Sequence, residues 1–266
     1  MKLLKHIIRA GALCGLLLTT AAAKAQTVQL KVLDWNVLSF EMTDKSNQID
    51  FIVDEYVDLI KAQNPDIVCI NELETGTSRM GKEKLTELAS RLDMYPYFIM
   101  SYPKDVGFYG NGILSKYPIL EERSFRLGIP GRDYMRSFGY VRIRKQGHDI
   151  CFATTHLDHK ADDSLRIAQI REILRLTEHI NIPIILGGDM NARPEEAPIQ
   201  LLASRFDVGN SCSELTTDDD GGKTIDYLMY TPGSAFEVIS HEVDYAAAKA
   251  SDHYPVLVTF KLASFL

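Results

Sequence analysis

Apolar runs that end in polar residues recur along this chain of 266 residues. Residues Val28–Trp35 alternate apolar and polar side chains, which predicts a strand with one buried face. Residues Ile184–Leu186 form a continuous apolar run before Gly187 and Gly188. This pattern is typical of a buried strand that reaches the edge of a sheet, where the backbone turns tightly or is closely approached. By the same criteria we predict further strands at residues 66–70, 97–101, 107–115, 136–144, 149–155, 224–230, 236–243 and 256–258.

Helical periodicity fills several of the intervals between these strands. At helical spacing, one apolar face is formed by Ile49, Ile52, Val53, Tyr56 and Ile60. A second helix is predicted to run from a cap at residues 162–164 to about Ile180, and shorter helices are predicted at residues 82–92 and 197–203. No internal repeat or Pro/Ser-rich linker interrupts the pattern, so we expect one domain of mixed strands and helices.

The first 25 residues have the pattern of a secretory signal peptide. A basic start is followed by a mostly apolar run from Ile7 to Thr20 and by the small-residue pattern Ala23-Lys24-Ala25. We therefore predict a signal peptide at residues 1–25, a catalytic domain at residues 26–266, and export to the periplasm or the outside of the cell. The apolar run is shorter than the roughly 20 residues that cross a bilayer, so no stable membrane insertion is expected.

Composition and charge narrow the functional classes. With 45% hydrophobic and 24% charged residues, the chain has the composition of a globular protein with an ample core rather than of a disordered one. Removal of the signal peptide would change the formal charge from −7 to −11, because four basic residues lie in it. Such an acidic protein is not expected to hold nucleic acid on a broad basic surface, although a few arginines and a bound cation can dominate a single cleft.

Three cysteines lie beyond the predicted signal peptide. Cys69 and Cys151 fall within apolar runs and are expected to be small buried hydrophobic residues. An odd number at wide spacing fits neither a disulfide framework nor a zinc site. The disulfide state of these two residues and of Cys212 stays open at this point.

Residues of the kinds that bind metals and phosphates follow the predicted strands: Asn36, Glu72, His156, Asp189, Asn191, Asp252 and His253. In strand geometry Asp189 and Asn191 would project to the same side and could share one water or one phosphate. Singly, each residue can also be a turn cap or a solvated charge. Their common position at strand ends predicts that they converge on one rim of a sheet. Asp226 lies among apolar neighbours in another predicted strand and should therefore be paired.

These residues belong to short motifs that occur in a recognisable order between Leu33 and Val258. The motifs are Asn-Glu-Leu-Glu at 71–74, Thr-His-Leu at 155–157, Gly-Asp-Met-Asn at 188–191, Ile-Asp-Tyr at 225–227 and Ser-Asp-His-Tyr-Pro at 251–255. As a set they resemble the endonuclease/exonuclease/phosphatase superfamily of metal-dependent phosphoesterases. The resemblance implies an α/β fold, a four-layer α-β-β-α sandwich of two mixed β-sheets flanked by helices, with the site at one end of the sandwich.

The resemblance also implies roles for these residues. It implies that Glu72 is a metal ligand, that Asn36 lies next to that ion, and that Asp252 is a second metal or proton-relay group. His156 would contact the phosphate, and Asp189 and Asn191 would orient the attacking water and the phosphoryl oxygens. Asp226 would hold His253, which serves the phosphate. Oxygen ligands of this kind suit Mg²⁺, with Mn²⁺ as an alternative. Either His253 or Asp189 could be the general base.

We therefore predict an exported Mg²⁺-dependent phosphoesterase that hydrolyses phosphodiesters by in-line attack of water, with a nuclease as one candidate. Alternatives are a lipid or small-molecule phosphodiesterase or phosphatase of the same family, and a binding module that has lost turnover. The inositol-phosphatase branch is disfavoured because its Trp-Cys-Asp-Arg type motif is replaced by Thr-Ile-Asp-Tyr at 224–227. The phosphoester is the only partner expected. Candidate substrate contacts are Asn111, Arg132, Arg136 and Lys160. A hairpin position is enough to explain Asn111, and a surface charge is the commoner role of each of the other three.

Overall fold

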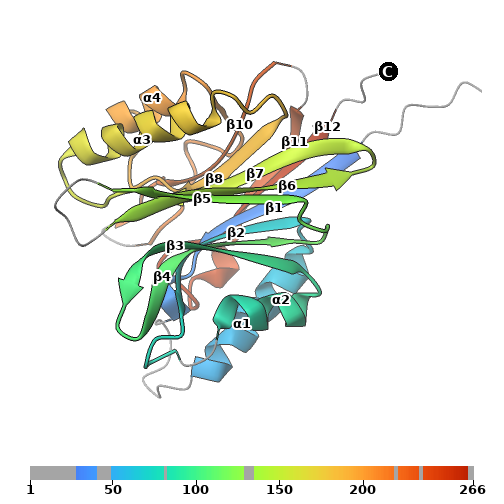
Figure 1. Cartoon of the computed structure of the whole chain (residues 1–266), viewed down its shortest axis with the longest axis vertical. Coiled ribbons are helices and arrows are strands. Elements are labelled where there is room, and N and C mark those ends of the chain that lie inside the picture. The colour runs from blue at the N-terminus through green and yellow to red at the C-terminus, as the bar shows by residue number, and fades with distance from the viewer. Residues whose placement is uncertain are drawn as a thin grey trace, which may run out of the picture.

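The computed structural model describes residues 28–40, 49–80, 83–128, 135–218, 221–233 and 236–262. The chain forms four layers, with two β-sheets face to face in the middle and helices on both outer sides (Figure 1). Helices α1 (Ile49–Gln63) and α2 (Lys84–Leu92) cover one sheet, and α3 (Asp163–Thr177) and α4 (Ala197–Leu202) cover the other. The predicted signal peptide, Lys82 and Arg132 lie outside the described residues.

Each sheet has six strands. The first follows the spatial order β11 (Phe236–Val243), β12 (Val256–Leu262), β1 (Val28–Asn36), β2 (Ile67–Thr75), β4 (Gly107–Ser115), β3 (Tyr95–Lys104). The second follows the order β5 (Glu121–Leu127), β6 (Arg136–Lys145), β7 (His148–His156), β8 (Ile184–Asp189), β10 (Asp226–Tyr230), β9 (Asp207–Val208). Strands β1 and β2 are parallel, as are β7 and β8, whereas β1 and β12 are antiparallel. The predicted sandwich of two mixed sheets is confirmed.

The alternation of side chains along β1 shows how the sequence builds both the core and the site. Leu30 and Val32 point into the core between the sheets, whereas Leu33 and Trp35 pack against the helix layer. The same alternation makes Asp34 and Asn36 the next two residues of β1 that face the space between the sheets. They lie at the polar end of that space. The apolar core therefore changes into a polar site without a change of fold.

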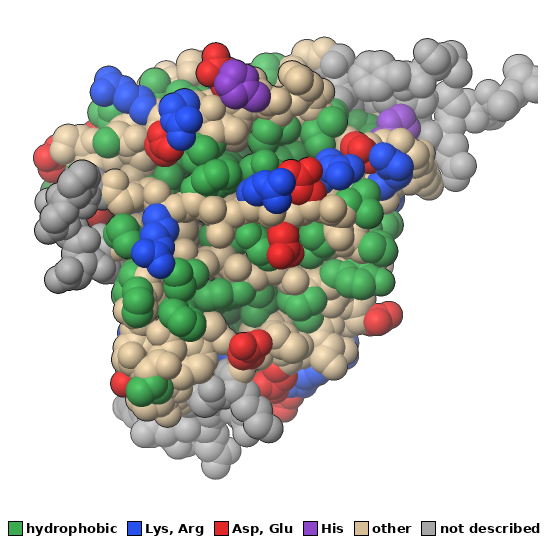
Figure 2. Space-filling model, viewed as in Figure 1, with side chains coloured by type: hydrophobic (Ala, Val, Ile, Leu, Met, Phe, Trp, Pro, Cys, Tyr) green, Lys and Arg blue, Asp and Glu red, His purple; other side chains and the backbone are tan. Residues whose placement is uncertain are grey.

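Most of the predicted strands and helices are present, with ends that differ by a few residues. The analysis of the sequence missed β5 and β9, of which β5 is a mostly exposed strand that pairs with β6. Cys69 and Cys151 are buried as predicted, Cys212 is exposed, and all three are free thiols. On the described part of the face shown in Figure 2, acidic and basic side chains are interspersed rather than gathered into one basic surface. Among the described residues, no helix combines the length and the apolar character needed to cross a membrane.

Candidate active site

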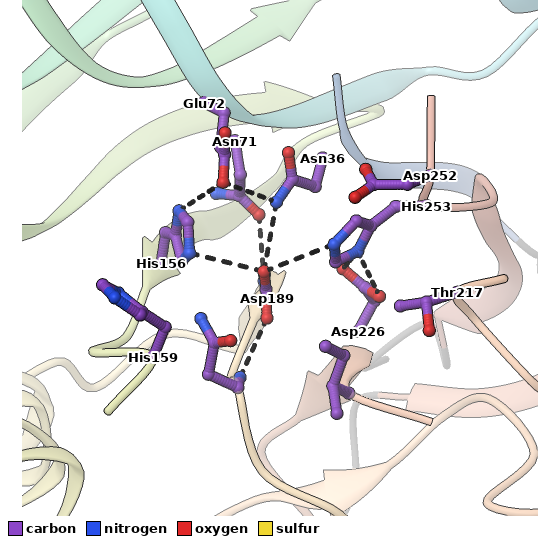
Figure 3. Close-up of polar contacts among 12 residues, drawn as sticks. Asn36, Asn71, Glu72, His156, His159, Asp189, Thr217, Asp226, Asp252 and His253 are labelled. Atoms are coloured by element: carbon purple, nitrogen blue, oxygen red, sulfur yellow. Dashed lines mark hydrogen bonds and ion pairs between the residues drawn. The ribbon is translucent and has the colours of Figure 1, made fainter. Parts of the chain in front are cut away.

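The predicted polar residues lie together where strands of the two sheets and their adjoining loops meet (Figure 3). The residues come from both sheets: Asn36 from β1, Glu72 from β2, His156 from β7, Asp189 from β8, Asp226 from β10, and Asp252 and His253 from the segment before β12. The prediction that these residues share one rim of the sandwich is confirmed.

Asp189 lies at the centre of this group, and two glycines allow it to be there. A Cβ atom at Gly187 would come within 2.9 Å of Asp34 Oδ1, and one at Gly188 would lie 1.9 Å from the carbonyl oxygen of Thr155. Gly188 also has a φ of +148°, a backbone angle that residues with a side chain rarely adopt. Strand β8 can therefore pack closely against its neighbours only because both positions lack a side chain, and this packing fixes the depth of Asp189.

The carboxylate of Asp189 is 2% exposed and is held by amide groups. Its Oδ2 accepts a hydrogen bond from Asn36 Nδ2 at 3.1 Å, and its Oδ1 accepts one from the backbone amide of Asn191 at 2.8 Å. Burial, followed by the negative charge of Asp226, raises the pKa of Asp189 to about 7, while the positive charge of His253 opposes the rise. A carboxylate with a pKa near neutrality is suited to accept a proton from water.

His253 and Asp226 form a buried pair beside Asp189. His253 Nδ1 donates to Asp226, with its two oxygens at 2.9 and 3.1 Å, and Thr216 Oγ1 donates to the same carboxylate at 2.7 Å. Burial lowers the pKa of His253, but the carboxylates of Asp226, Asp189 and Asp252, of which Asp226 acts most strongly, together raise the pKa to about 10. His253 is therefore a cation at neutral pH, with Nε2 facing Asp189 Oδ2 at 3.9 Å. The expected pairing of Asp226 is confirmed.

His156 flanks Asp189 on the other side and differs from His253 in charge. Arg136 Nη1 lies 2.9 Å from His156 Nδ1, and an arginine can only donate, so Nδ1 accepts. The ring proton is then on Nε2, which lies 3.3 Å from Asp189 Oδ2. Burial and the charge of Arg136 hold the pKa of His156 well below its usual value, so the ring is neutral. Asp189 thus lies between one cationic and one neutral hydrogen-bond donor.

Glu72, the predicted metal ligand, has a carboxylate that is partly open to solvent. It lies at an irregularity in the pairing of β2 with β4, and its φ of +60° turns it out of the regular ladder. Its side chain is 23% exposed, and its Oε1 lies 3.2 Å from Asn36 Nδ2. Oxygen donors of this kind fit a hard divalent cation. Asp189, Asp226 and His253 also form a compact group of potential ligands, but Asp226 already receives the Nδ1 proton of His253.

Three predicted residues are arranged differently from what the sequence suggested. Strand β8 ends at Asp189 and Asn191 has a φ of +47°, so the expected common strand face of these two residues is wrong, and Asn191 Nδ2 donates to the carbonyl of Leu157. Asn36 presents its amide nitrogen to Glu72 and Asp189, while its oxygen accepts from the Leu38 amide. Asn111 is 1% exposed and is hydrogen bonded at both ends of its amide, which favours a structural position behind the site.

The structure adds one residue whose importance the sequence analysis missed. Asn71, beside Glu72, accepts a hydrogen bond from the Asp189 backbone amide at 2.9 Å and donates to the Thr155 carbonyl at 3.1 Å. It also donates to Asn111 at 3.1 Å, so one buried amide ties the two sheets together directly behind Asp189. Its place directly after the strand predicted at residues 66–70, and directly before Glu72, was the available signal.

Comparison with known proteins finds related sequences and structures. Rat nocturnin is 23% identical over 278 residues, covering 85% of this chain, which spans 63% of nocturnin's length. The structure of an endonuclease/exonuclease/phosphatase from Beutenbergia cavernae has 22% identity, covers 89% of this chain and 72% of its own, and gives a TM-score of 0.76. The structure of ANGEL2, a 2′,3′-cyclic phosphatase, in complex with adenosine-2′,3′-vanadate has 15% identity, covers 89% of this chain and 96% of its own, and gives a TM-score of 0.71. The sequence pattern of the Endonuclease/Exonuclease/phosphatase family matches residues 35–253. The chain therefore belongs to the endonuclease/exonuclease/phosphatase family of metal-dependent phosphoesterases.

Proposed function

We propose that this chain is an exported phosphodiesterase that uses Mg²⁺, with Mn²⁺ as a substitute, and hydrolyses phosphodiesters of nucleotides or nucleic acid. The observation that carries the proposal is the buried Asp189, with neutral His156 at 3.3 Å on one side and cationic His253 at 3.9 Å on the other. This arrangement supplies a proton acceptor between two donors, as attack of water on a phosphodiester requires. Export rests on the signal-peptide pattern of residues 1–25.

The bound cation would neutralise the charge on the phosphoryl oxygens and make the attacking water more acidic. Glu72 would hold it together with Asp252, and Asn36 would orient Glu72 through the contact at 3.2 Å. Asp189 accepts the proton of the attacking water. We assign it the role of general base because His253, with a pKa of about 10, already carries its proton at neutral pH.

The two histidines then act as donors. Nε2–H of His156 donates to a phosphoryl oxygen, since Arg136 fixes the ring proton on that nitrogen. The cationic His253 stabilises the negative charge that develops in the transition state and is placed to protonate the leaving oxygen. Asp226 keeps His253 charged and correctly oriented through the bond at 2.9 Å.

The choice of nucleotide substrates draws support from a relative. ANGEL2 is a 2′,3′-cyclic phosphatase whose structure holds adenosine-2′,3′-vanadate. At 15% identity, ANGEL2 resembles this chain in fold. Nucleotide phosphoesters are therefore the first substrates to test.

The test is a comparison of bis-p-nitrophenyl phosphate, p-nitrophenyl phosphate, 2′,3′-cyclic AMP, single-stranded oligonucleotides and a choline phosphodiester, each with Mg²⁺, Mn²⁺ or EDTA. We expect the diesters to be hydrolysed faster than the monoester, the nucleotide substrates faster than the choline diester, and all turnover to stop in EDTA. A preference for the monoester, or turnover that EDTA leaves unchanged, would overturn the proposal. Sequencing of the N-terminus of exported protein tests the predicted start at Gln26.

A further inference from the structure

A second imidazole lies against Arg136 at the edge of the site. Arg136 Nη2 is 3.3 Å from His159 Nδ1, while Nη1 of the same guanidinium is 2.9 Å from His156 Nδ1. Arg136 is 3% exposed and His156 is equally buried, whereas His159 is exposed to solvent. One buried guanidinium therefore joins two imidazoles. His156 is the last residue of β7, and His159 follows it by three residues; Figure 3 shows both rings.

Arg136 is the hydrogen-bond donor in both of these contacts. A guanidinium has only donors, so Nδ1 of each ring accepts, and the ring proton lies on Nε2. In His156 this proton points toward Asp189 Oδ2. The position of the Arg136 guanidinium thus decides which nitrogen of His156 carries the proton that the proposed reaction uses.

A competing acceptor lies close to the same atoms. Glu72 Oε1 is 3.9 Å from His156 Nδ1, the nitrogen to which Arg136 donates. Carboxylates bind guanidinium groups more strongly than neutral imidazoles do. A guanidinium that turned toward Glu72 would release His156 Nδ1 and would also occupy the carboxylate that is proposed to hold the cation. Nη2 of the same guanidinium lies 3.3 Å from His159 Nδ1, and this contact opposes such a turn.

We propose that His159 is a positioning residue, which accepts a hydrogen bond from Arg136 and so holds the guanidinium on Nδ1 of His156. The geometric part of this inference is independent of turnover, and its kinetic part rests on the proposed phosphodiesterase function. His159 is not a catalytic residue in this account, since it acts on the reacting groups through Arg136 and His156.

Substitution of His159 by residues with amide side chains can distinguish the roles of its two ring nitrogens. The side-chain oxygen of asparagine takes about the place of Nδ1 in histidine, whereas the amide of glutamine reaches the place of Nε2. His159→Asn therefore keeps the acceptor for Arg136, His159→Gln displaces it, and His159→Leu removes it. His148→Leu is the matched control, because His148 lies at the opposite end of the same strand, β7.

The first readout is the ¹⁵N spectrum of the His156 imidazole in the metal-free protein. We expect one tautomer, protonated on Nε2, in wild type, His159→Asn and His148→Leu, and a mixture of tautomers in His159→Leu and His159→Gln. The same single tautomer in every variant would overturn the proposal, and this result does not depend on whether any substrate is hydrolysed.

The second readout is hydrolysis of bis-p-nitrophenyl phosphate. We expect kcat to fall about 10-fold or more in His159→Leu, as is typical when a residue that orients a functional histidine is lost, and to recover in His159→Asn but not in His159→Gln. Recovery in His159→Gln alone would show that Nε2 contacts the substrate directly and would overturn the positioning role. If wild-type protein hydrolyses no phosphoester, the proposed function fails, while the imidazole spectra still decide the role of His159.

Discussion

Replacement of Asp226 by asparagine isolates the electrostatic part of the His253–Asp226 pair. Asparagine has nearly the same shape and can still accept the Nδ1–H bond through its amide oxygen, so the variant removes the charge and keeps most of the packing. Asp226 is 1% exposed and His253 is 8% exposed, so water screens the interaction little. The change is therefore expected to act mainly on the charge of His253.

The magnitude follows from the geometry. An opposite charge at hydrogen-bond distance raises the pKa of a histidine by about 1 to 3 units. The upper end applies here, because both carboxylate oxygens lie within 3.1 Å of Nδ1 and the pair is buried. Three units correspond to about 4 kcal/mol. The pKa of His253, raised to about 10 in the wild type, is then expected to fall to about 7 in Asp226→Asn.

The assay is a pH titration of the His253 ring by NMR, together with the pH dependence of diester hydrolysis. At pH 8 we expect His253 to be protonated in the wild type and mostly neutral in Asp226→Asn, with kcat reduced by on the order of 10³–10⁴, as when a histidine loses the carboxylate that orients it. Asp149→Asn is the control, because Asp149 pairs with Arg142 and Arg144 on the far end of β7. An Asp226→Asn variant in which His253 still titrates above pH 9 would refute the reasoning.

Two further predictions concern stability. Gly188→Ala should lower the free energy of unfolding by about 1–3 kcal/mol, because the new Cβ would lie 1.9 Å from the carbonyl oxygen of Thr155. Urea denaturation measures the change, and an unchanged midpoint of unfolding would contradict the prediction. Asp34 is fully buried, and burial, together with the negative charges of Asp226 and Asp189, raises its pKa well above the usual value. The folded state therefore retains a proton that the unfolded chain loses above about pH 4, so this residue's contribution to stability is lost as pH rises, by up to about 1.4 kcal/mol per pH unit. Asp34→Asn should make stability depend less on pH, so that the variant has a higher melting temperature than the wild type at pH 8 but not at pH 4. Equal slopes of melting temperature against pH in the two proteins would exclude Asp34 as the cause.

The order of strands and helices could be predicted because the information is local. Alternating or continuous apolar runs mark β1 and β8, and the core that they form follows from which face is apolar. Strand β5 was missed because its sequence, Glu121–Leu127, is mostly polar and it pairs with β6 as an exposed edge strand. An edge strand of this kind has no buried alternation to detect.

The polar residues of the site could be named in advance, but their contacts could not. Neighbouring parallel strands carry Asn36 beside Asn71 in one sheet and His156 beside Asp189 in the other, so these polar residues could be expected to lie together. The amide of Asn71 meets Asp189 across 118 residues of sequence, and no periodicity reports such a contact. The orientation of Asn191 was also unpredictable, because it depends on strand β8 ending at Asp189 and on the bond to Leu157.

The most direct test of the account is the rate of bis-p-nitrophenyl phosphate hydrolysis by wild type and Asp189→Asn, measured with Mg²⁺ and with EDTA after both proteins are shown to be folded. The account predicts Mg²⁺-dependent turnover by the wild type that falls by on the order of 10²–10⁴ in the variant, because the amide cannot accept the proton of the attacking water. Equal turnover by the two proteins in Mg²⁺ would contradict the central role of Asp189.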